Sequence, residues 1–352
     1  MKGAGMCRSF RLEKLVSSCT SFVKGDAFYM KIGFLGAGNI AGMVAPAVSQ
    51  VEQIECYAVA ARDKDRADAF AKKWGFQKSY GSYEELMRDP EVDVIYVGTP
   101  HSHHYEQMLD ALRHGKGVIG EKAFCINSAQ AEHIQKYAKE NKLFAAEAIW
   151  PRYMPSRKVI RDLIDSGIVG EPSVLTANLF YNISEIERIT NPALAGGALL
   201  DVGIYTLNFA LMCFGNDIQR IESSIQKHET GVDAIDNITI YFQNGRVAML
   251  SAGIYSRSDR KGIIHGTKGY IVVENINNPQ SVSVYDTEDN LVQKVEFPQK
   301  VNGYEYEFEE MAKAFDAGKT GCESMPMDET VFVLSLCDQL RKQWGLKYPQ
   351  EV

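Results

Sequence analysis

The sequence predicts an α/β protein with a doubly wound parallel sheet, followed by an α+β domain with a large, mainly antiparallel open sheet. Two observations support this prediction. Short β-branched strands alternate with helices from Met30 to Ala148, as a parallel sheet with crossovers requires. Beyond Trp150 the strands follow one another with few helices between them, which is typical of an antiparallel sheet.

The length of 352 residues accommodates two domains of ordinary size. We expect an N-terminal extension over residues 1–29, a nucleotide-binding domain over 30–148 and a second domain over 149–352. The extension contains no continuous apolar stretch and makes a poor secretory signal. We interpret it as an upstream segment with little fixed structure; an organelle-targeting peptide is the alternative.

Each expected element of the first domain follows from its local composition. The strands are short apolar runs over Lys31–Leu35, Glu55–Ala61, Asp93–Val97, Gly117–Gly120 and Leu143–Ala146. The helices between them cover Asn39–Ser49, Asp63–Trp74, Tyr83–Arg88, Ser102–His114 and Ser128–Asn141. Because helices separate the strands, each connection crosses a face of the sheet and the strands run parallel.

The second domain is expected to begin with a helix over Ser156–Ser166, a strand over Ser173–Phe180 and a helix over Gly197–Phe214. The remaining strand candidates are Ile218–Gln226, Ile235–Phe242, Val247–Ile254, Lys261–His265, Tyr270–Val273, Val282–Tyr285 and Val292–Phe297. Two helices, Tyr304–Ala317 and Asp328–Trp344, close the chain.

Composition and charge exclude several classes of partner. The formal net charge is -7, whereas binding to nucleic acid or to an anionic membrane requires a concentrated basic face. No apolar run approaches the ~20 residues that cross a bilayer. Seven scattered cysteines without a Cys-x-x-Cys pair indicate reduced thiols in the cytoplasm and exclude a conventional zinc cluster.

The first expected strand leads into a Gly-x-Gly-x-x-Ala turn that is typical of a dinucleotide site. Gly36 permits the tight turn, and Gly38 lets the backbone approach a pyrophosphate. Asn39, Ile40 and Ala41 begin the next helix, whose unpaired N–H groups attract the anion. We therefore expect these five residues to bind a nicotinamide dinucleotide.

The end of the second strand favours NADP over NAD, with NAD as the alternative. An acidic residue usually binds the adenine-side ribose of NAD at this point, but this chain has Ala61 followed by Arg62. The Arg62 guanidinium can stack on adenine and bind a 2′-phosphate through two hydrogen bonds. The neighbouring Asp63 either caps the following helix or turns toward the ribose.

The fourth strand is followed by Gly-Thr-Pro-His-Ser-His-His, at the edge where ligands bind in open α/β sheets. We expect Thr99, Pro100 and His104 to contact the cofactor, and surface or capping roles for His101 and His103. Neighbouring residues at a helix start point in different directions, and no acidic or cysteine ligand completes the set. No metal site is therefore expected.

Two further segments carry groups suited to proton transfer. Glu121 and Lys122 follow the fifth strand at the same edge of the sheet, and we expect both beside the cofactor. On an apolar helix of the second domain, Asp201 and Tyr205 are spaced i and i+4 and share one face. Buried polar side chains on such a helix must find partners.

Together these motifs resemble the glucose-fructose oxidoreductase, inositol dehydrogenase and rhizopine-catabolism family. The resemblance rests on Gly36–Ala41, Gly120-Glu-Lys122, Glu147-Ala-Ile-Trp-Pro-Arg152, Gly196–Tyr205, Ala60–Asp63, Tyr80–Leu86, His228–Asp233 and Gly266–Gly269. It extends from about Met30 to the C-terminus and is strongest toward the branch of dimeric dihydrodiol dehydrogenases and NADP-dependent D-xylose dehydrogenases. It implies a Rossmann nucleotide-binding domain and a homodimer formed through the sheet of the second domain.

The resemblance also implies roles for individual residues. Lys122 matches the family's catalytic lysine, Asp201 its carboxylate partner and Tyr205 the acid/base tyrosine of the dihydrodiol branch. Many other members have His at the position of Tyr205. Ala123 replaces the proline of the family's usual Glu-Lys-Pro motif.

These residues predict hydride-transfer oxidation of a hydroxyl on a sugar, polyol or cyclic diol, or the reverse carbonyl reduction. Tyr205 is the expected base, with Lys122 favouring its phenolate and Asp201 keeping Lys122 charged. In the alternative, Lys122 transfers the proton and Tyr205 only hydrogen-bonds the substrate.

The expected substrate pocket contains Trp150, Arg152 and Tyr181 as well as Tyr205. Aromatic faces suit the C–H surface of a ring, and Arg152 could bind hydroxyls or an acidic group. A core position at the domain junction is the alternative for Trp150. Two other functions stay open: a non-catalytic dinucleotide-binding sensor or scaffold, and an oxidoreductase with permanently bound NADP.

Overall fold

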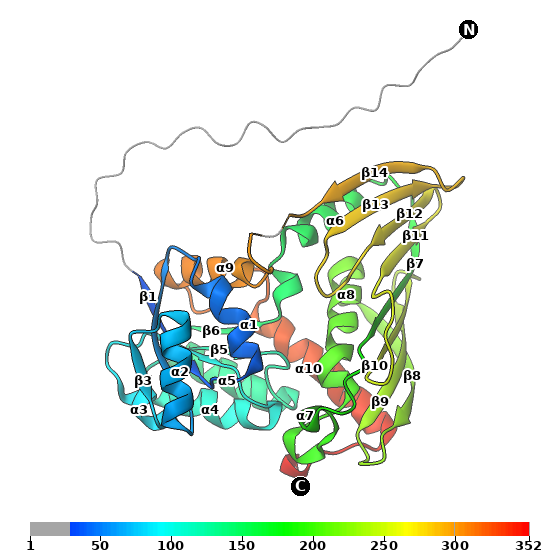
Figure 1. The fold of residues 1–352 in the computed structure, drawn as a ribbon. Helices are drawn as coiled ribbons and strands as arrows, with labels where there is room; N and C mark the ends of the chain where they lie inside the picture. Colours follow the sequence, from blue (N-terminus) through cyan, green and yellow to red (C-terminus); the bar gives the residue numbers. More distant parts are fainter. Residues whose placement is uncertain (1–28, 299, 352) are drawn as a thin grey trace, which may run out of the picture.

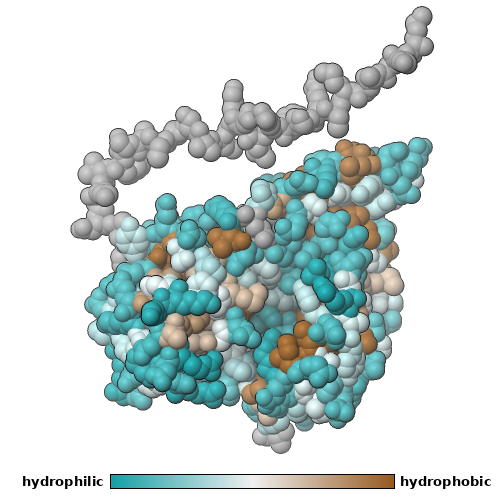
Figure 2. Space-filling model, viewed as in Figure 1, coloured by the Kyte–Doolittle hydropathy of each residue, from teal (hydrophilic) through white to brown (hydrophobic). Residues whose placement is uncertain are grey.

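The computed structural model describes residues 29–298 and 300–351, so the predicted N-terminal extension lies outside the described residues except for Tyr29. Two separate sheets organise the chain (Figure 1). The sheet formed by the N-terminal strands and the larger C-terminal sheet lie on opposite sides of helices from the second half of the sequence. On the face shown in Figure 2, polar residues dominate and apolar residues form separate small patches.

The first sheet has six parallel strands in the order β3-β2-β1-β4-β5-β6. The strands are β1 (Met30–Leu35), β2 (Ile54–Ala60), β3 (Lys78–Tyr80), β4 (Val94–Val97), β5 (Gly117–Glu121) and β6 (Ala145–Ala148). The helices are α1 (Asn39–Val48), α2 (Lys64–Trp74), α3 (Tyr83–Arg88), α4 (His101–Arg113) and α5 (Ser128–Glu140). Every residue of β4 and β5 is buried, as expected for central parallel strands covered on both faces.

The edge strand β3 is the element of this sheet that the sequence analysis missed. It has only three residues, and all of them are exposed or half-buried. A strand this short carries no apolar run, so its composition gave no signal.

The second sheet has eight strands in the order β14-β13-β12-β11-β7-β10-β9-β8. They are β7 (Pro172–Phe180), β8 (Ile218–Lys227), β9 (Asp233–Phe242), β10 (Val247–Gly253), β11 (Gly262–Gly266), β12 (Gly269–Val273), β13 (Ser281–Asp286) and β14 (Leu291–Glu296). Only the β7–β10 pair is parallel among these neighbours. The predicted combination of a parallel sheet and a mainly antiparallel sheet is therefore confirmed.

The inner face of the second sheet packs on the apolar helix α8 (Ile204–Phe214). The predicted single helix Gly197–Phe214 instead consists of a π-helical turn η3 (Leu199–Gly203) and α8, and a 3-10 turn η2 (Pro192–Leu194) precedes it. Within the described residues, Pro192–Phe214 is the one segment long and apolar enough to cross a membrane by length and hydropathy. All of the apolar window within it is buried inside the protein.

Two helices from the end of the chain pack against the first sheet and its helices. The remaining elements are η1 (Trp150–Arg152), α6 (Pro155–Asp165), α7 (Glu187–Thr190), α9 (Glu305–Asp316), α10 (Met327–Trp344) and η4 (Pro349–Glu351). Helix α9 packs on α1 and β1, whereas α10 packs on α5 and also reaches α8 and β8. Figure 1 shows α10 running between the two sheets. The order of elements in the sequence did not predict that α9 and α10 pack against the first domain.

Arg341 fixes the end of α10 against the first domain. Its buried guanidinium pairs with Glu351 at 2.6 Å and with Asp338 at 2.7 Å, and it donates to the carbonyl oxygen of Ile126 at 3.1 Å. Because two carboxylates share this one cation, its removal leaves both without a charged partner.

Replacing Arg341 with Met is expected to lower the free energy of unfolding by about 3 kcal/mol, because the variant leaves two partly buried carboxylates unpaired. Chemical denaturation at neutral pH measures the change. Lys158→Met is the control, since the exposed Lys158–Asp162 pair contributes at most about 1 kcal/mol. Equal losses in the two variants would contradict a specific role for Arg341.

Candidate active site

The glycine loop after β1 forms an open cradle at the N-terminus of α1. Gly36 has a φ of 110°, and a Cβ at this position would lie 3.2 Å from the carbonyl oxygen of Gly98. Gly38 is the extended N-cap of α1; it provides no capping side chain, and the space where its Cβ would lie is open. The first N–H groups of α1 can therefore bind an anion such as a pyrophosphate.

A cavity of about 290 Å³ lies beside this cradle. Its lining includes the predicted residues Gly36, Gly38, Arg62, Thr99 and Pro100, together with Ala37, Ala61, Asp63, Arg66, Tyr83 and Gly98. The cavity follows the carboxyl ends of β1, β2 and β4, where the strand order reverses. This switch point is the usual ligand position in an open α/β sheet, so the cavity suits a dinucleotide.

Asp63 caps α2, which is one of the two roles left open for it, and it also lines the cavity. Its Oδ1 accepts hydrogen bonds from the N–H groups of Asp65 at 2.9 Å and Arg66 at 3.4 Å. Burial raises the pKa of Tyr83, while the charges of Arg62 and Arg66 lower it, so both guanidinium groups act on the same hydroxyl. The end of the cavity thus combines two cations with an aromatic ring. Arg66 follows Arg62 by four residues, a spacing that could have identified it from the sequence.

The structure contradicts the predictions for His101 and His104. His104 is fully buried; its Nδ1 lies 2.9 Å from the Ala123 carbonyl oxygen and its Nε2 lies 2.7 Å from the Thr99 carbonyl oxygen. Burial lowers its pKa to about 4. The ring therefore joins the loops after β4 and β5 instead of contacting the cofactor cavity. His101 is buried rather than at the surface, with Nδ1 3.2 Å from the Ala195 carbonyl oxygen.

Ile40, Ala41 and Glu121 were also predicted to bind the cofactor, but they are not part of the cavity lining. Ala41 is buried, and Ile40 packs where a Cβ on Gly98 would point. Glu121 is also buried: Oε1 accepts from the Tyr96 hydroxyl at 2.8 Å and Oε2 from the backbone N–H of Lys122 at 3.2 Å. Glu121 therefore holds the lysine loop and does not line the cavity.

The predicted lysine and aspartate meet in the structure although they are far apart in sequence. Lys122 Nζ donates to the backbone carbonyl oxygen of Asp201 at 2.9 Å and to its Oδ1 at 3.2 Å. Arg188 on α7 donates to the same Oδ1 at 2.8 Å. Burial acts to raise the pKa of Asp201, but the charges of Lys122 and Arg188 hold it below its usual range. The peptide bond between Lys122 and Ala123 is cis.

Tyr205 lies beside this ion group, one helical turn after Asp201. Lys122 Nζ lies over the Tyr205 ring, 5.2 Å from its centre, which is within the range of a cation–π interaction. Burial raises the pKa of Tyr205 well above its ordinary value, and the nearby Tyr304, Glu121 and Asp201 raise it further. This is opposite to the expected phenolate: the phenol is protonated at neutral pH.

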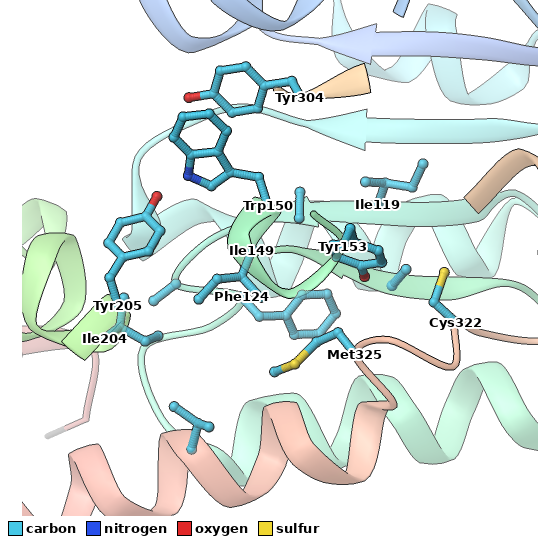
Figure 3. Close-up of a cluster of buried hydrophobic side chains, with 14 of the residues drawn as sticks. Ile119, Phe124, Ile149, Trp150, Tyr153, Ile204, Tyr205, Tyr304, Cys322 and Met325 are labelled. Carbon is cyan, nitrogen blue, oxygen red and sulfur yellow. The ribbon is translucent and has the colours of Figure 1, made fainter. Parts of the chain in front are cut away.

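Three further aromatic residues form a group near Tyr205, called the aromatic wall below: Trp150, Tyr304 and Tyr181. Trp150 stacks on Tyr304 with ring centres 4.3 Å apart, and Figure 3 shows its indole nitrogen directed toward the Tyr205 hydroxyl. The indole N–H donates to Asn277 Oδ1 at 3.0 Å, and Asn277 Nδ2 donates to the Tyr181 hydroxyl at 3.1 Å. Trp150 and Tyr181, two residues of the predicted substrate pocket, are thus connected through Asn277. Tyr304, Asn277 and Arg188 had no sequence signal, because only the fold brings them here.

Arg152 is not brought to this group of residues. Its Nε donates to Asn208 Oδ1 at 2.9 Å, and its Nη2 pairs closely with Glu329 on α10. The side chain is buried, so its charge is neutralised within the protein core. The guanidinium therefore joins η1 to α8 and α10 instead of binding substrate hydroxyls or an acidic group, as predicted.

The assembled groups are an ammonium, a buried phenol and an anion cradle at one edge of a parallel sheet. His104 connects the cavity loop to the lysine loop, so the two parts are held together. Within residues 29–298 and 300–351, no group of three or more His, Cys, Asp or Glu side chains is arranged to bind a metal. The arrangement can hold a nicotinamide dinucleotide and move a proton beside it.

Two solved structures have the same fold. A 3-ketoreductase from Actinomadura kijaniata in complex with NADP and TDP-benzene superposes with a TM-score of 0.82 at 24% identity, covering 89% of this chain and 97% of that chain. An aldose-aldose oxidoreductase from Caulobacter crescentus has a TM-score of 0.81 at 20% identity, covering 90% of this chain and 98% of that chain.

Sequence comparisons identify the family. Residues 30–148 match the oxidoreductase family with an NAD-binding Rossmann fold, and residues 158–272 match the GFO/IDH/MocA C-terminal domain. Trans-1,2-dihydrobenzene-1,2-diol dehydrogenase of Mus musculus is 31% identical over 92% of this chain and 99% of its own length. The Xenopus laevis enzyme of the same name is 33% identical over 91% and 99%. The chain therefore belongs to the GFO/IDH/MocA family of NAD(P)-dependent oxidoreductases.

Proposed function

We propose that this oxidoreductase uses NADP to oxidise a hydroxyl of a sugar or cyclic diol, or to reduce the corresponding carbonyl. The observation that carries the proposal is the meeting of Lys122, Asp201 and Tyr205 next to the loops of a dinucleotide cavity. The diol dehydrogenases that resemble the chain along nearly all of its length support the same substrate class.

The glycine loop and the cavity would hold the dinucleotide, with its pyrophosphate at the N-terminus of α1. When bound, the nicotinamide supplies or accepts the hydride. Trp150 and Tyr304 stack on each other and are each 7% exposed, so only their small exposed parts would border a ring-shaped substrate. Asn277 fixes Trp150 through its indole N–H, so that wall is held in place.

Tyr205 is the proposed proton donor in carbonyl reduction. Because its phenol is protonated at neutral pH, it can hydrogen-bond the carbonyl oxygen and transfer its proton there as negative charge develops. Lys122, held by Asp201, stabilises that charge with its ammonium. In the oxidation direction the reverse step starts from the Tyr205 phenolate, which accepts the proton of the substrate hydroxyl while Lys122 stays charged.

Tyr205→Phe is expected to lower kcat for reduction by about 10²- to 10⁴-fold, because it removes the proton donor. Lys122→Met is expected to lower kcat by a similar factor. Since the pKa of Tyr205 is raised, the wild-type rate of reduction should not fall before about pH 10, the ordinary pKa of tyrosine. Absorbance of NADPH with a panel of aldoses, inositols and cyclic diols, or their carbonyl forms, measures these rates. Tyr241→Phe, on the second sheet, is the control.

Wild-type turnover in both the Tyr205 and the Lys122 variants would overturn the proposed chemistry. Binding of NADPH without turnover of any member of the panel would instead favour the non-catalytic dinucleotide-binding protein. Cofactor that co-purifies and does not exchange would indicate permanently bound NADP.

The preference for NADP is supported by Arg62 and Arg66. Both lie at the end of the cavity with Tyr83, and Asp63 is engaged in capping α2. An Arg–phosphate hydrogen bond is charge-assisted, whereas the ribose hydroxyl of NAD offers no charge to these side chains. A 2′-phosphate therefore gains more from this end of the cavity than a hydroxyl does.

Changing both Arg62 and Arg66 to Ala is expected to raise KM for NADP by about 100-fold, because each charge-assisted contact contributes roughly tenfold. KM for NAD should change by less than about threefold, since NAD lacks the phosphate. Steady-state kinetics with both cofactors measures the split. Arg113→Ala, on the exposed end of α4, is the control. A wild-type preference for NAD would remove this role from the two arginines.

We further propose a homodimer formed through the outer face of the second sheet. Burial alternates along β10, where Ala248 and Leu250 face the core while Met249 is 52% exposed at the centre of the sheet. An apolar side chain in the middle of an open sheet face suits a subunit interface. No nucleic acid or membrane partner is proposed.

Met249→Lys is expected to shift the molar mass from dimer to monomer at micromolar concentration, because it places a charge at the centre of the interface. Light scattering after size-exclusion chromatography measures the mass. Met43→Lys is the matched control, since Met43 is similarly exposed on α1. An unchanged dimer in the Met249 variant would place the interface elsewhere.

A cytoplasmic location is also proposed. The described cysteines, Cys56, Cys125, Cys213, Cys322 and Cys337, are free thiols. Free buried thiols are typical of proteins in a reducing compartment. Localisation of the tagged full-length chain by fluorescence tests this proposal.

A further inference from the structure

Two buried carboxyl groups lie beneath the helical segment that carries Asp201 and Tyr205. Asp233 and Asp236 belong to β9 and are 1% and 0% exposed. Among the described residues, no N–H or hydroxyl group donates to Oδ1 of Asp233 or to either Oδ of Asp236. Buried polar atoms without partners are costly, so these three oxygens require another source of hydrogen bonding.

Both carboxyl groups are in direct contact with the backbone of η3. Oδ2 of Asp233 accepts the N–H of Leu199, the first residue of η3, at 2.5 Å. A Cβ on Gly197 would lie 2.2 Å from Oδ1 of Asp233, and a Cβ on Gly203 would lie 3.2 Å from Oδ2 of Asp236. Glycine at these two positions therefore lets the carboxyl pair approach the backbone just before η3 and at its last residue.

We propose that Asp233 and Asp236 share one proton, and that this acid pair is a positioning device for η3 and therefore for Asp201 and Tyr205. A proton on Asp236 donated to Oδ1 of Asp233 gives the otherwise unpartnered carboxyl groups a hydrogen bond to each other. Asp233 then keeps the negative charge with which Oδ2 accepts the N–H of Leu199.

The surroundings of the pair favour a single negative charge. From α10, Arg341 lowers the pKa of Asp233, and the thiol of Cys337 lies near the second carboxyl group; the hydroxyl of Tyr348 also faces the pair. Lys227 on β8 lies opposite Asp233 in the sheet register, but within the described chain it forms no ion pair with it. The guanidinium of Arg341 is already bound to two other carboxylates, so a second charge on the pair has no dedicated partner.

The pair predicts a dependence of stability on pH with a definite sign. Burial raises the pKa of Asp236 well above its ordinary value, and the charge of Asp233 raises it further. A carboxyl group with a raised pKa in the folded state gives stability that is complete below the unfolded pKa. That stability is lost as pH rises through the folded pKa. Asp236→Asn removes this dependence, because an amide donates the same hydrogen bond at every pH.

The experiment compares full-length wild type with Asp236→Asn and Asp236→Ala. Thermal unfolding should show that Tm of the wild type falls more steeply with rising pH than Tm of Asp236→Asn. At neutral pH, Asp236→Asn should keep kcat within about threefold, whereas Asp236→Ala should lose at least about tenfold in kcat with little change in KM for NADP. Asp89→Asn is the control: it removes another buried carboxyl group, which accepts from the Tyr80 hydroxyl on β3, and should leave kcat within about twofold.

Equal pH dependence of Tm in wild type and Asp236→Asn would overturn the shared proton. Equal loss of kcat in the Asn and Ala variants would overturn the positioning role. The kcat comparison rests on the proposed function, but the Tm comparison does not. If no substrate is turned over while the Tm difference is present, the proposed function fails and the acid pair stands.

Discussion

The buried carboxylate of Asp201 is the constraint on which the arrangement of the site depends. A charge removed from water must be neutralised within the protein, and here Lys122 and Arg188 supply the two cations. Lys122 follows the first sheet, whereas Arg188 and Asp201 precede the helix that packs on the second. This ion group therefore links the loop after the first sheet to the helical segment that packs on the second sheet.

Two other buried carboxyl groups stabilise the site by accepting hydrogen bonds. Glu121 and Glu147 are buried near the lysine loop, and burial raises the pKa of Glu147 to about 7. Glu147 accepts hydrogen bonds from the backbone N–H of Phe124 at 3.2 Å and from the Thr330 hydroxyl at 2.9 Å. These acids support the loop that carries Lys122 through hydrogen bonds to its backbone N–H groups.

Local patterns in the sequence were sufficient for the elements of both sheets except β3, and for the cradle at Gly36 and Gly38. They could not give the direction of a side chain. His104 stands at the expected edge of the sheet, yet its ring is turned inward to two carbonyl groups, and Arg152 is drawn toward Glu329. The raised pKa of Tyr205 results from burial by several elements, so it could not be predicted from any single segment of the sequence.

The return of α9 and α10 to the first sheet has a consequence for the synthesis of the chain. Domains usually fold as units while the polypeptide emerges, N-terminal part first. Here the surfaces of β1 and α5 that pack against these helices stay uncovered until α9 and α10 have been synthesised. The nucleotide-binding half is thus translated first but completed last, and its unfinished apolar faces are the part of the nascent protein that a chaperone would have to shield.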